Sequence, residues 1–513
     1  MKQWIKEAII YEIYPISFYD SNGDGLGDFN GITQKIPYLV DLGVNTVWIN
    51  PFYQSPFKDG GYDITDYYAV DGRFGSMQDC ENMLQAFHKA GIRIIVDLVV
   101  GHTSDKHEWF KKSKQAKPHP QYKNWYIWTD CCFTPADRSM KGMSKRNGNY
   151  IVNYYAFQPA LNYGFNEIKK GEESWQWHYT DERLKPLRDE IINIIRFWLK
   201  KGVDGFRVDL ANSLVKADKN GEGVKWFWNV VIGEAKKINP DCCFLAEWGN
   251  PIKAAECGFD LDYLCHATQP YNELFRSDKG TNLTAWLERA GHSYFAKEGK
   301  GEFKNFLAYV TDIFKNSQGA YSIPTGFHDI IRIAEKKDVG VLKCIFAFIL
   351  TFKCVPQIYY GDEIGIKHNY RVNKDGGYTR TGARTPMQWD NSLHRGFTTA
   401  KRAYLPTESA KNRSVESQKG DEKSLYNTVK TLIKLHTTYP QFSYGAELKM
   451  INDKYPLEFV RRANSEEIYI AINPTQRDYE IKQKAKTVLA QENVEIKEKT
   501  IKLKKYSFIV IKR

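Results

Sequence analysis

The sequence lacks the features that would place it in a membrane, secreted or disulfide-rich class. No apolar run approaches the ~20 residues of a membrane span, and the opening MKQWIKEAIIYEIYP lacks the apolar core of a signal peptide. The nine cysteines are an odd number, show no CxxC spacing and include the adjacent pairs Cys131–Cys132 and Cys242–Cys243. That pattern argues against a disulfide framework. We expect a cytoplasmic protein with no membrane partner.

Positive charge exceeds negative charge by 12 over the 513 residues. A basic excess can attract nucleic acid, but here the Lys and Arg residues are scattered along the chain. The densest run, KEKTIKLKKY at 497–506, alternates with apolar residues as a half-exposed strand does. We therefore predict a solvated strand face and no nucleic-acid partner.

Short β-rich apolar runs recur, separated by stretches with helical periodicity such as GITQKIPYLVDLG (31–43) and MQDCENMLQAFHKAG (77–91). The eight runs are IIYEIY (9–14), NTVWIN (45–50), RIIVDLVV (93–100), GFRVDL (205–210), CFLAEW (243–248), FDLDYL (259–264), YSIPTGF (321–327) and VPQIYY (355–360). Such alternation predicts a parallel barrel or a doubly wound sheet. Eight runs are the number that a (β/α)8 TIM barrel requires.

Two stretches depart from this alternation. Residues 103–172, between the third and fourth runs, are rich in Trp, Tyr, Asn, Lys and Pro and have no clear helical period. From 431 to 513 short alternating runs follow one another without helices, which is typical of an antiparallel β-sandwich. We predict a barrel built from 1–102 and 173–430, with 103–172 as an inserted domain B after strand three.

The segment DSNGDGLGDF, at 20–29, sets oxygen-bearing side chains at alternate positions among three glycines. Hard cations take oxygen ligands from such tightly turned loops. An EF-hand would need a glutamate where Gly31 stands, and the preceding residues read as a strand rather than a helix. The alternative is a polar turn without an ion. We predict a structural metal that takes no part in chemistry.

Ionisable residues gather at the ends of the predicted strands. They are Asp97, His102, Arg207, Asp209, Glu247, His328 and Asp329. Any one of them could be a loop cap or a buried histidine of the core. Because the carboxyl ends of barrel strands meet on one face, their joint occurrence predicts an active site there.

Asp209 and Glu247 end successive strands, and neighbouring strands lie about 4.8 Å apart. Their carboxyls can therefore approach the ~5–5.5 Å separation of a retaining glycosidase. Arg207 lies two residues before Asp209, so both side chains point the same way, and its charge would hold Asp209 ionised as a nucleophile. Glu247, beside Trp248 and an apolar run, would stay protonated as the general acid.

The chain resembles glycoside hydrolase family 13, the α-amylase family, over essentially its whole length. DLVVGHTS (97–104), GFRVDL (205–210), FLAEW (244–248) and FHD (327–329) resemble the four signature segments of that family in the right order. QPALN (158–162) resembles the fifth segment. The resemblance implies a TIM barrel with a loop domain B and a C-terminal β-domain.

The resemblance also implies roles for individual residues. Asp209 would be the nucleophile, Glu247 the acid/base, and Asp329 a third acid that binds sugar hydroxyls and favours ring distortion. The same subsite would be lined by His102, Arg207 and His328.

Within the family, the sequence is most similar to compact exo-acting α-glucosidases of the oligo-1,6-glucosidase type. GGYDITDYY (60–68) and ARTPMQWD (383–390) carry that likeness. It implies that Tyr62 stacks on the terminal glucose and that an Asp63–Arg384 pair closes the far wall of the pocket. The alternative is that Asp63 and Arg384 are unrelated surface residues.

The DSNGDGLGD segment resembles the calcium loop of these glucosidases. The likeness implies a structural Ca²⁺, or alternatively Mg²⁺, and no organic cofactor. The implied metal ligands are Asp20, Asn22, Asp24, Leu26 and Asp28.

Some positions depart from the family pattern. Gly101 replaces an asparagine that helps to bind a second calcium ion in many amylases, which makes that site doubtful. Phe327 replaces the asparagine before the His-Asp pair, and Ala160 replaces the acid of the fifth segment. Leu210 follows the nucleophile at a position that influences linkage preference. These departures leave the three acids intact.

We therefore predict a retaining α-glucosidase that releases glucose from the non-reducing end of short malto- or isomalto-oligosaccharides. One alternative is a transglycosylase, or a trehalose- or sucrose-type isomerase or hydrolase of the same family, because a sugar can intercept the glycosyl-enzyme in place of water. A non-catalytic sugar-binding protein is a third hypothesis. The only partner expected is a small oligosaccharide, and we expect a monomer or a weak homo-oligomer.

Overall fold

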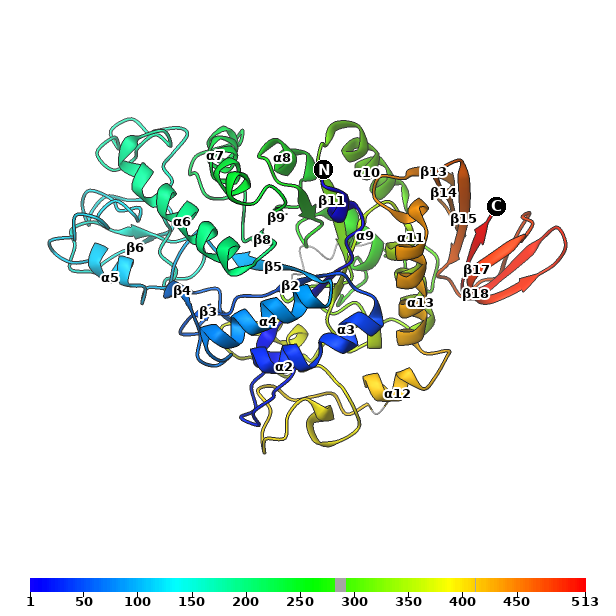
Figure 1. Cartoon of the computed structure of the whole chain (residues 1–513). Helices are drawn as coiled ribbons and strands as arrows, with labels where there is room; N and C mark the ends of the chain where they lie inside the picture. The colour runs from blue at the N-terminus through cyan, green and yellow to red at the C-terminus, as the bar shows by residue number, and fades with distance from the viewer. Residues whose placement is uncertain (282–291, 411) are drawn as a thin grey trace.

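The computed structural model describes residues 1–281, 292–410 and 412–513 and is built around a closed barrel of eight parallel strands (Figure 1). The strands are β1 (Ile10–Ile13), β2 (Thr46–Ile49), β5 (Arg93–Leu98), β8 (Gly205–Val208), β9 (Cys243–Glu247), β10 (Leu261–Tyr263), β11 (Ala320–Pro324) and β12 (Val355–Tyr359). Strand β1 closes the barrel, because Ile10 pairs with Thr46 of β2 and with Gln357 of β12. The predicted TIM barrel and all eight predicted runs are confirmed.

Helices follow the strands and cover the barrel. They are α1 (Gln3–Lys6), α2 (Phe29–Gln34), α3 (Ile36–Leu42), α4 (Met77–Lys89), α6 (Lys185–Lys201), α7 (Glu222–Ile238), α8 (Pro251–Glu256), α9 (Gln269–Phe275), α10 (Lys304–Asn316), α11 (Val339–Thr351), α12 (Val415–Lys419) and α13 (Leu425–Thr438). A capping box of Ser76 and Asp79 starts α4. The predicted helix over 31–43 is broken at Lys35, because Pro37 has no N–H to continue the first helix and begins a second.

The segment between β5 and α6 has little regular structure, which explains its lack of sequence period. It holds α5 (Glu108–Ser113), β6 (Ser139–Met140) and β7 (Tyr150–Ile151), and it lies at the left of Figure 1. A short pair of strands, β3 (Tyr53–Gln54) and β4 (Asp66–Val70), precedes it in the chain. The segment has a small apolar core of its own, made of Ile127, Ile151, Ala160, Phe165 and Trp175.

An antiparallel sheet ends the chain, as predicted for the C-terminal region. Its strands are β13 (Glu447–Asn452), β14 (Leu457–Ala463), β15 (Glu466–Asn473), β16 (Tyr479–Ile481), β17 (Thr487–Ile496) and β18 (Ile501–Lys512). The basic run KEKTIKLKKY spans the turn from β17 into β18, where Ile501 and Leu503 are buried. Lys502 and Lys504 form ion pairs with Asp478 and Glu495.

Helix α11 joins this sheet to the barrel. All of its residues from Val341 to Thr351 are buried, and it packs against β15, β18 and α13. A helix that is apolar on all sides belongs in the interior of a large protein or in a membrane. Within the part of the chain that the structure describes, no helix is both long and apolar enough to cross a membrane.

Candidate active site

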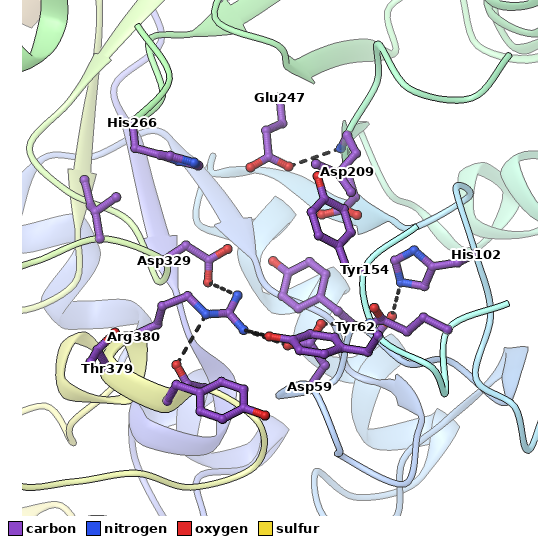
Figure 2. Close-up of a pocket in the computed structure, with 16 residues that line it drawn as sticks. Asp59, Tyr62, His102, Tyr154, Asp209, Glu247, His266, Asp329, Thr379 and Arg380 are labelled. Carbon is purple, nitrogen blue, oxygen red and sulfur yellow. Dashed lines mark hydrogen bonds and ion pairs between the residues drawn. The ribbon is translucent and has the colours of Figure 1, made fainter. Parts of the chain in front are cut away.

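A cavity of about 330 Å³ opens where the barrel strands end, and it contains the predicted catalytic carboxyls (Figure 2). Asp209, Glu247 and Asp329 all line it, together with Tyr62 and His102. Asp209 and Glu247 follow β8 and end β9, and these neighbouring strands pair in parallel. The carboxyl ends of parallel barrel strands therefore deliver the acids to one place.

Arg207 holds both of the central carboxylates. Its Nη1 lies 3.0 Å from Asp209 Oδ1 and its Nη2 lies 2.6 Å from Glu247 Oε2. The same guanidinium also pairs with the fully buried Asp97. Three carboxylates on one planar guanidinium form a fixed cluster, in which Asp209 and Glu247 are side by side.

The ionisation of Asp209 depends on this cluster. Burial raises the pKa of Asp209 well above the ordinary range of an aspartate. Arg207 opposes the rise, as predicted, but the negative charges of Glu247 and Asp97 add to it. Burial and the neighbouring carboxylates together outweigh the stabilising arginine.

Glu247 is also held by the backbone that follows the nucleophile. Leu210 N donates a hydrogen bond of 3.1 Å to Glu247 Oε2. Leu210 has a φ of 48°, a left-handed conformation that is uncommon for a branched side chain. This strained turn aims the Leu210 N–H at the carboxylate that the mechanism requires.

Asp329 lies between two arginines and lines the pocket. Its Oδ1 is 3.0 Å from Arg380 Nη1 and 2.7 Å from Arg384 Nη2. Burial raises the pKa of Asp329, but these two positive charges and His328 lower it well below the ordinary range. Asp329 is therefore an anion and an acceptor for hydroxyl groups.

The predicted ion pair between Asp63 and Arg384 is wrong. Asp63 instead accepts hydrogen bonds from the backbone of Lys58 and Asp59 and from Ser55 Oγ. Arg384 donates to Asp329 and to the His328 carbonyl oxygen. Asp63 therefore stabilises its own loop, and Arg384 lies behind Asp329, the third acid.

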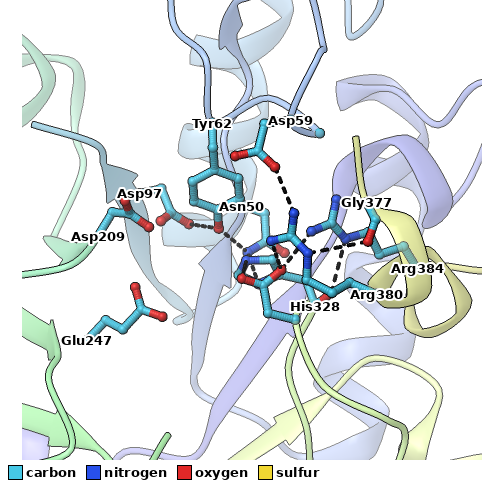
Figure 3. A network of polar contacts seen from close by, with 12 residues as sticks. Asn50, Asp59, Tyr62, Asp97, Asp209, Glu247, His328, Gly377, Arg380 and Arg384 are labelled. Atoms are coloured by element: carbon cyan, nitrogen blue, oxygen red, sulfur yellow. Dashed lines mark hydrogen bonds and ion pairs between the residues drawn. The ribbon is translucent and has the colours of Figure 1, made fainter. Parts of the chain in front are cut away.

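A different pair, Asp59 and Arg380, lies at this wall of the pocket. Arg380 Nη2 is 2.9 Å from Asp59 Oδ1, and both residues line the cavity (Figure 2 and Figure 3). Gln158 from the inserted segment donates to the other Asp59 oxygen at 2.8 Å. This pair, rather than the predicted one, joins the loop between β3 and β4 to the segment before Arg384.

Tyr62 and His102 line the cavity, and the buried His328 lies against Tyr62. The rings of Tyr62 and His328 stack with centroids 5.0 Å apart. His328 Nδ1 contacts Glu12, and His102 Nε2 contacts the Tyr62 carbonyl oxygen at 3.1 Å. Burial lowers the pKa of His102 to about 4 and that of His328 well below its ordinary value. Both imidazoles are neutral near pH 7 and can bind sugar hydroxyls.

The departures from the family pattern have structural explanations. Phe327 is fully buried and packs edge-on against Tyr263, with centroids 5.4 Å apart, so it fills space behind the pocket rather than narrowing it. Ala160 is buried in the core of the inserted segment. The Gly101 carbonyl accepts a hydrogen bond from Asn153, whose amide oxygen accepts one from Lys216.

The predicted metal loop is closed by its own hydrogen bonds. Asp20 accepts from the backbone of Asn22, Gly23 and Gly25 and from Thr398, while Asp24 accepts from Leu26 N. Asp28 accepts from Ser21 and from Gly31 N. Among the described residues, no three His, Cys, Asp or Glu side chains are grouped to hold a metal ion. These oxygens accept hydrogen bonds from the backbone of the loop. Calcium binding by the loop stays a prediction.

Several pocket residues were not identified from the sequence. They are Asp59, Tyr154, Tyr155, Gln158, His266, Ile330, Tyr378, Thr379 and Arg380. Asp59 and Arg380 stand four residues before Asp63 and Arg384, within or beside the motifs that were recognised. The others lie in irregular loops whose course no periodicity indicates.

Comparison with known proteins agrees with this geometry. A family model described as the catalytic domain of alpha amylase matches residues 12–445. An oligo-1,6-glucosidase of Parageobacillus thermoglucosidasius is 29% identical over 546 residues, covering 92% of this chain and 91% of that protein. An alpha-glucosidase of Candida albicans is 29% identical over 554 residues, covering 93% of each.

Proteins with other named functions also match this chain. The amino acid transporter heavy chain SLC3A1 of Homo sapiens is 29% identical over 506 residues, covering 91% of this chain and 70% of that protein. The solved structure of the trehalulose synthase MutB from Pseudomonas mesoacidophila MX-45 matches with a TM-score of 0.83 and 24% identity over 100% of both chains. Proteins of this shape differ in function, so the side chains of the site must decide.

Proposed function

Because the chain belongs to the alpha-amylase family, glycoside hydrolase family 13, and is a glycoside hydrolase, we propose that it is a retaining α-glucosidase acting on short α-glucosides. The observation that carries the proposal is the placement of Asp209 and Glu247 on one guanidinium, in a pocket where Asp59 pairs with Arg380.

The first chemical step uses both carboxyls. The Asp209 carboxylate attacks the anomeric carbon of the bound glucose while the Glu247 carboxyl gives its proton to the departing glycosidic oxygen. The bond from the anomeric carbon to that oxygen breaks, and a covalent glycosyl-enzyme forms on Asp209. Arg207, which contacts both groups, keeps them aligned during the transfer.

The second step reverses the proton transfer. Glu247, now ionised, takes a proton from a water molecule, and the resulting oxygen attacks the anomeric carbon and releases Asp209. Asp329 and the neutral histidines His102 and His328 hold the hydroxyl groups of the same glucose. Two inversions leave the α-configuration unchanged.

The Asp59–Arg380 ion pair supports action at a chain end. The pair crosses the inner wall of the pocket, and Gln158 and Tyr155 hydrogen-bond to it from the inserted segment. A polysaccharide cannot run through such a wall without separating the two charges, which is costly when they are partly buried. The terminal, non-reducing glucose would therefore enter first.

Product analysis tests the proposal. Wild type, Asp209→Asn and Glu247→Gln are incubated with maltose, isomaltose, trehalose, sucrose and maltoheptaose, and the released sugars are followed by NMR. We expect α-glucose from the short substrates in wild type and none in either variant. New disaccharides with little free glucose would instead identify a transferase or isomerase, and sugar binding without turnover would identify a binding protein.

A further inference from the structure

The pocket contains a third histidine, His266, which the proposed mechanism does not use. It follows β10 and lines the cavity. Figure 2 shows its imidazole reaching toward the Glu247 carboxyl, on the opposite side of the catalytic acids from Tyr154. His102 and Tyr62, which would bind the terminal glucose, lie away from His266 in the same view. His266 therefore lies beside the group that protonates the leaving oxygen.

The ring of His266 is held in position but has a free nitrogen. Its main-chain oxygen accepts a hydrogen bond of 2.7 Å from Asn272 Nδ2, and the buried Phe327 ring lies 6.1 Å from the imidazole. Within the described part of the chain, the buried His266 Nδ1 has no hydrogen-bond partner. Because that nitrogen is buried, it faces the protein, and the part of the ring that lines the cavity is the part that can meet a ligand.

The direction of the substrate places a leaving group at this histidine. A glucose at the inner end has its anomeric carbon at Asp209 and its glycosidic oxygen at Glu247. The leaving group must then extend past Glu247, where Figure 2 shows His266 on one side and Tyr154 on the other. Tyr154 is 61% exposed, as expected for a ring that covers the face of a ligand.

We propose that His266 is a specificity-determining residue that hydrogen-bonds to a hydroxyl group of the leaving sugar beside Glu247. The inference rests on the proposed glucosidase function and specifies its substrate. A volume of about 330 Å³ is near the lower end of the roughly 300–1,000 Å³ of ligand pockets.

The test separates recognition of the leaving group from chemistry. Maltose and isomaltose have a leaving sugar with hydroxyl groups, whereas para-nitrophenyl α-glucoside has an aryl leaving group without them. We compare kcat/KM for both substrate types in wild type, His266→Phe and His266→Gln. His119→Phe, a change at an exposed histidine of the inserted segment, is the matched control.

Loss of one hydrogen bond, at about 0.5–1.5 kcal/mol, predicts a fall of roughly 2- to 13-fold in kcat/KM for the disaccharide in His266→Phe. The aryl glucoside should stay within about twofold of wild type, which also shows that the variant is folded. His266→Gln should recover part of the loss, because an amide can still hydrogen-bond, and His119→Phe should resemble wild type.

Equal losses on both substrate types would overturn the inference, because His266 would then act on the acid or on folding. No loss on either type would also overturn it. Failure of the wild type to release glucose from every one of these substrates would instead overturn the glucosidase function, and with it this inference.

Discussion

At the scale of single residues, the protonation of Asp209 should govern the acid side of the pH profile. Its pKa is raised well above the ordinary value because the carboxyl is buried and because Glu247 and Asp97 are nearby. A nucleophile must be ionised, so activity is lost as pH falls through this raised pKa. We expect the acid limb of kcat/KM above the ordinary aspartate pKa of about 3.9.

The variant Asp97→Asn tests the cause of that limb. It removes one negative charge and frees Arg207 for Asp209, and both effects lower the pKa of Asp209. The acid limb should therefore move to lower pH. An unchanged limb would mean that Asp209 is not the group whose ionisation controls the profile.

The Asp59–Arg380 pair can be distinguished from Asp63 by substitution. Asp59→Asn removes a charge-assisted bond, at about 1.5–3 kcal/mol, and should lower kcat/KM roughly 10- to 150-fold. Arg380→Gln also removes the ion pair with Asp329 and should lower kcat/KM at least as much. The control Asp63→Asn alters hydrogen bonds within its own loop. It should lower the melting temperature clearly and have a smaller effect on kcat/KM. The reverse ranking in steady-state kinetics and thermal melts would refute this assignment.

The same loop shows what the sequence could and could not predict about the site. Asp209 and Glu247 were predicted because they end successive strands, and Asp329 was predicted as the third acid through the resemblance of FHD (327–329) to a signature segment of the family. Asp59 was missed in favour of Asp63 because Gly60 and Gly61, with φ of 58° and 104°, turn the loop. Glycine takes such angles freely, so the pattern does not indicate which aspartate faces Arg380.

At the scale of elements, the loop at 20–28 offers a test of the predicted metal. Gly25 has a φ of 94°, and a Cβ there would lie 2.4 Å from the Arg402 carbonyl oxygen, so the turn is tightly packed. We expect Asp24→Ala to lower the melting temperature more than turnover at moderate temperature, with Asp137→Ala as the exposed control. A chelator should also lower the wild-type melting temperature, because a metal that binds only the folded state stabilises it. A wild-type melting temperature that the chelator does not change would rule out calcium in this loop.

The turn after β9 depends on Asp262 of β10. Asp262 Oδ1 accepts hydrogen bonds from Trp248 N and Gly249 N, and burial raises its pKa to about 8. The unfolded value is about 3.9, so the folded state binds more protons between these values, and stability falls as pH rises across that window. Asp262→Asn has no titratable group at this position. The melting temperature of the variant should therefore rise relative to that of wild type as the pH increases from 5 to 8. The exposed Asp241→Asn should show no such trend, and a constant difference for Asp262→Asn would contradict the assignment.

Regular elements were predictable where apolar residues repeat, and irregular ones were not. The eight barrel strands and α4 follow directly from periodicity and capping. The segment 103–172 has little regular structure, and hydrogen bonds between distant residues, such as that from Asn153 to Gly101, shape it. Such contacts depend on the folded barrel, so local sequence does not indicate them.

At the scale of the whole molecule, the C-terminal sheet should be required for a soluble barrel. Helix α11 is buried along Val341–Thr351, and β15 and β18 cover one side of it. The buried Arg461 of β14 donates to the Thr351 and Ser443 carbonyl oxygens at 2.9 and 2.7 Å, which ties the sheet to the end of α11. A chain ending at residue 446 would expose this apolar helix, and large apolar patches promote aggregation.

We therefore expect the truncated chain to be aggregated in light scattering, while full-length Arg461→Met remains soluble with a lower melting temperature and unchanged kcat. Loss of the charge leaves two buried carbonyl groups without their donor, at about 1–3 kcal/mol each, yet keeps the sheet over α11. A monodisperse, active fragment without the sheet would show that the barrel folds independently. In that case another part of the chain would have to cover the apolar surface of α11. The C-terminal sheet would then not be needed to complete the core.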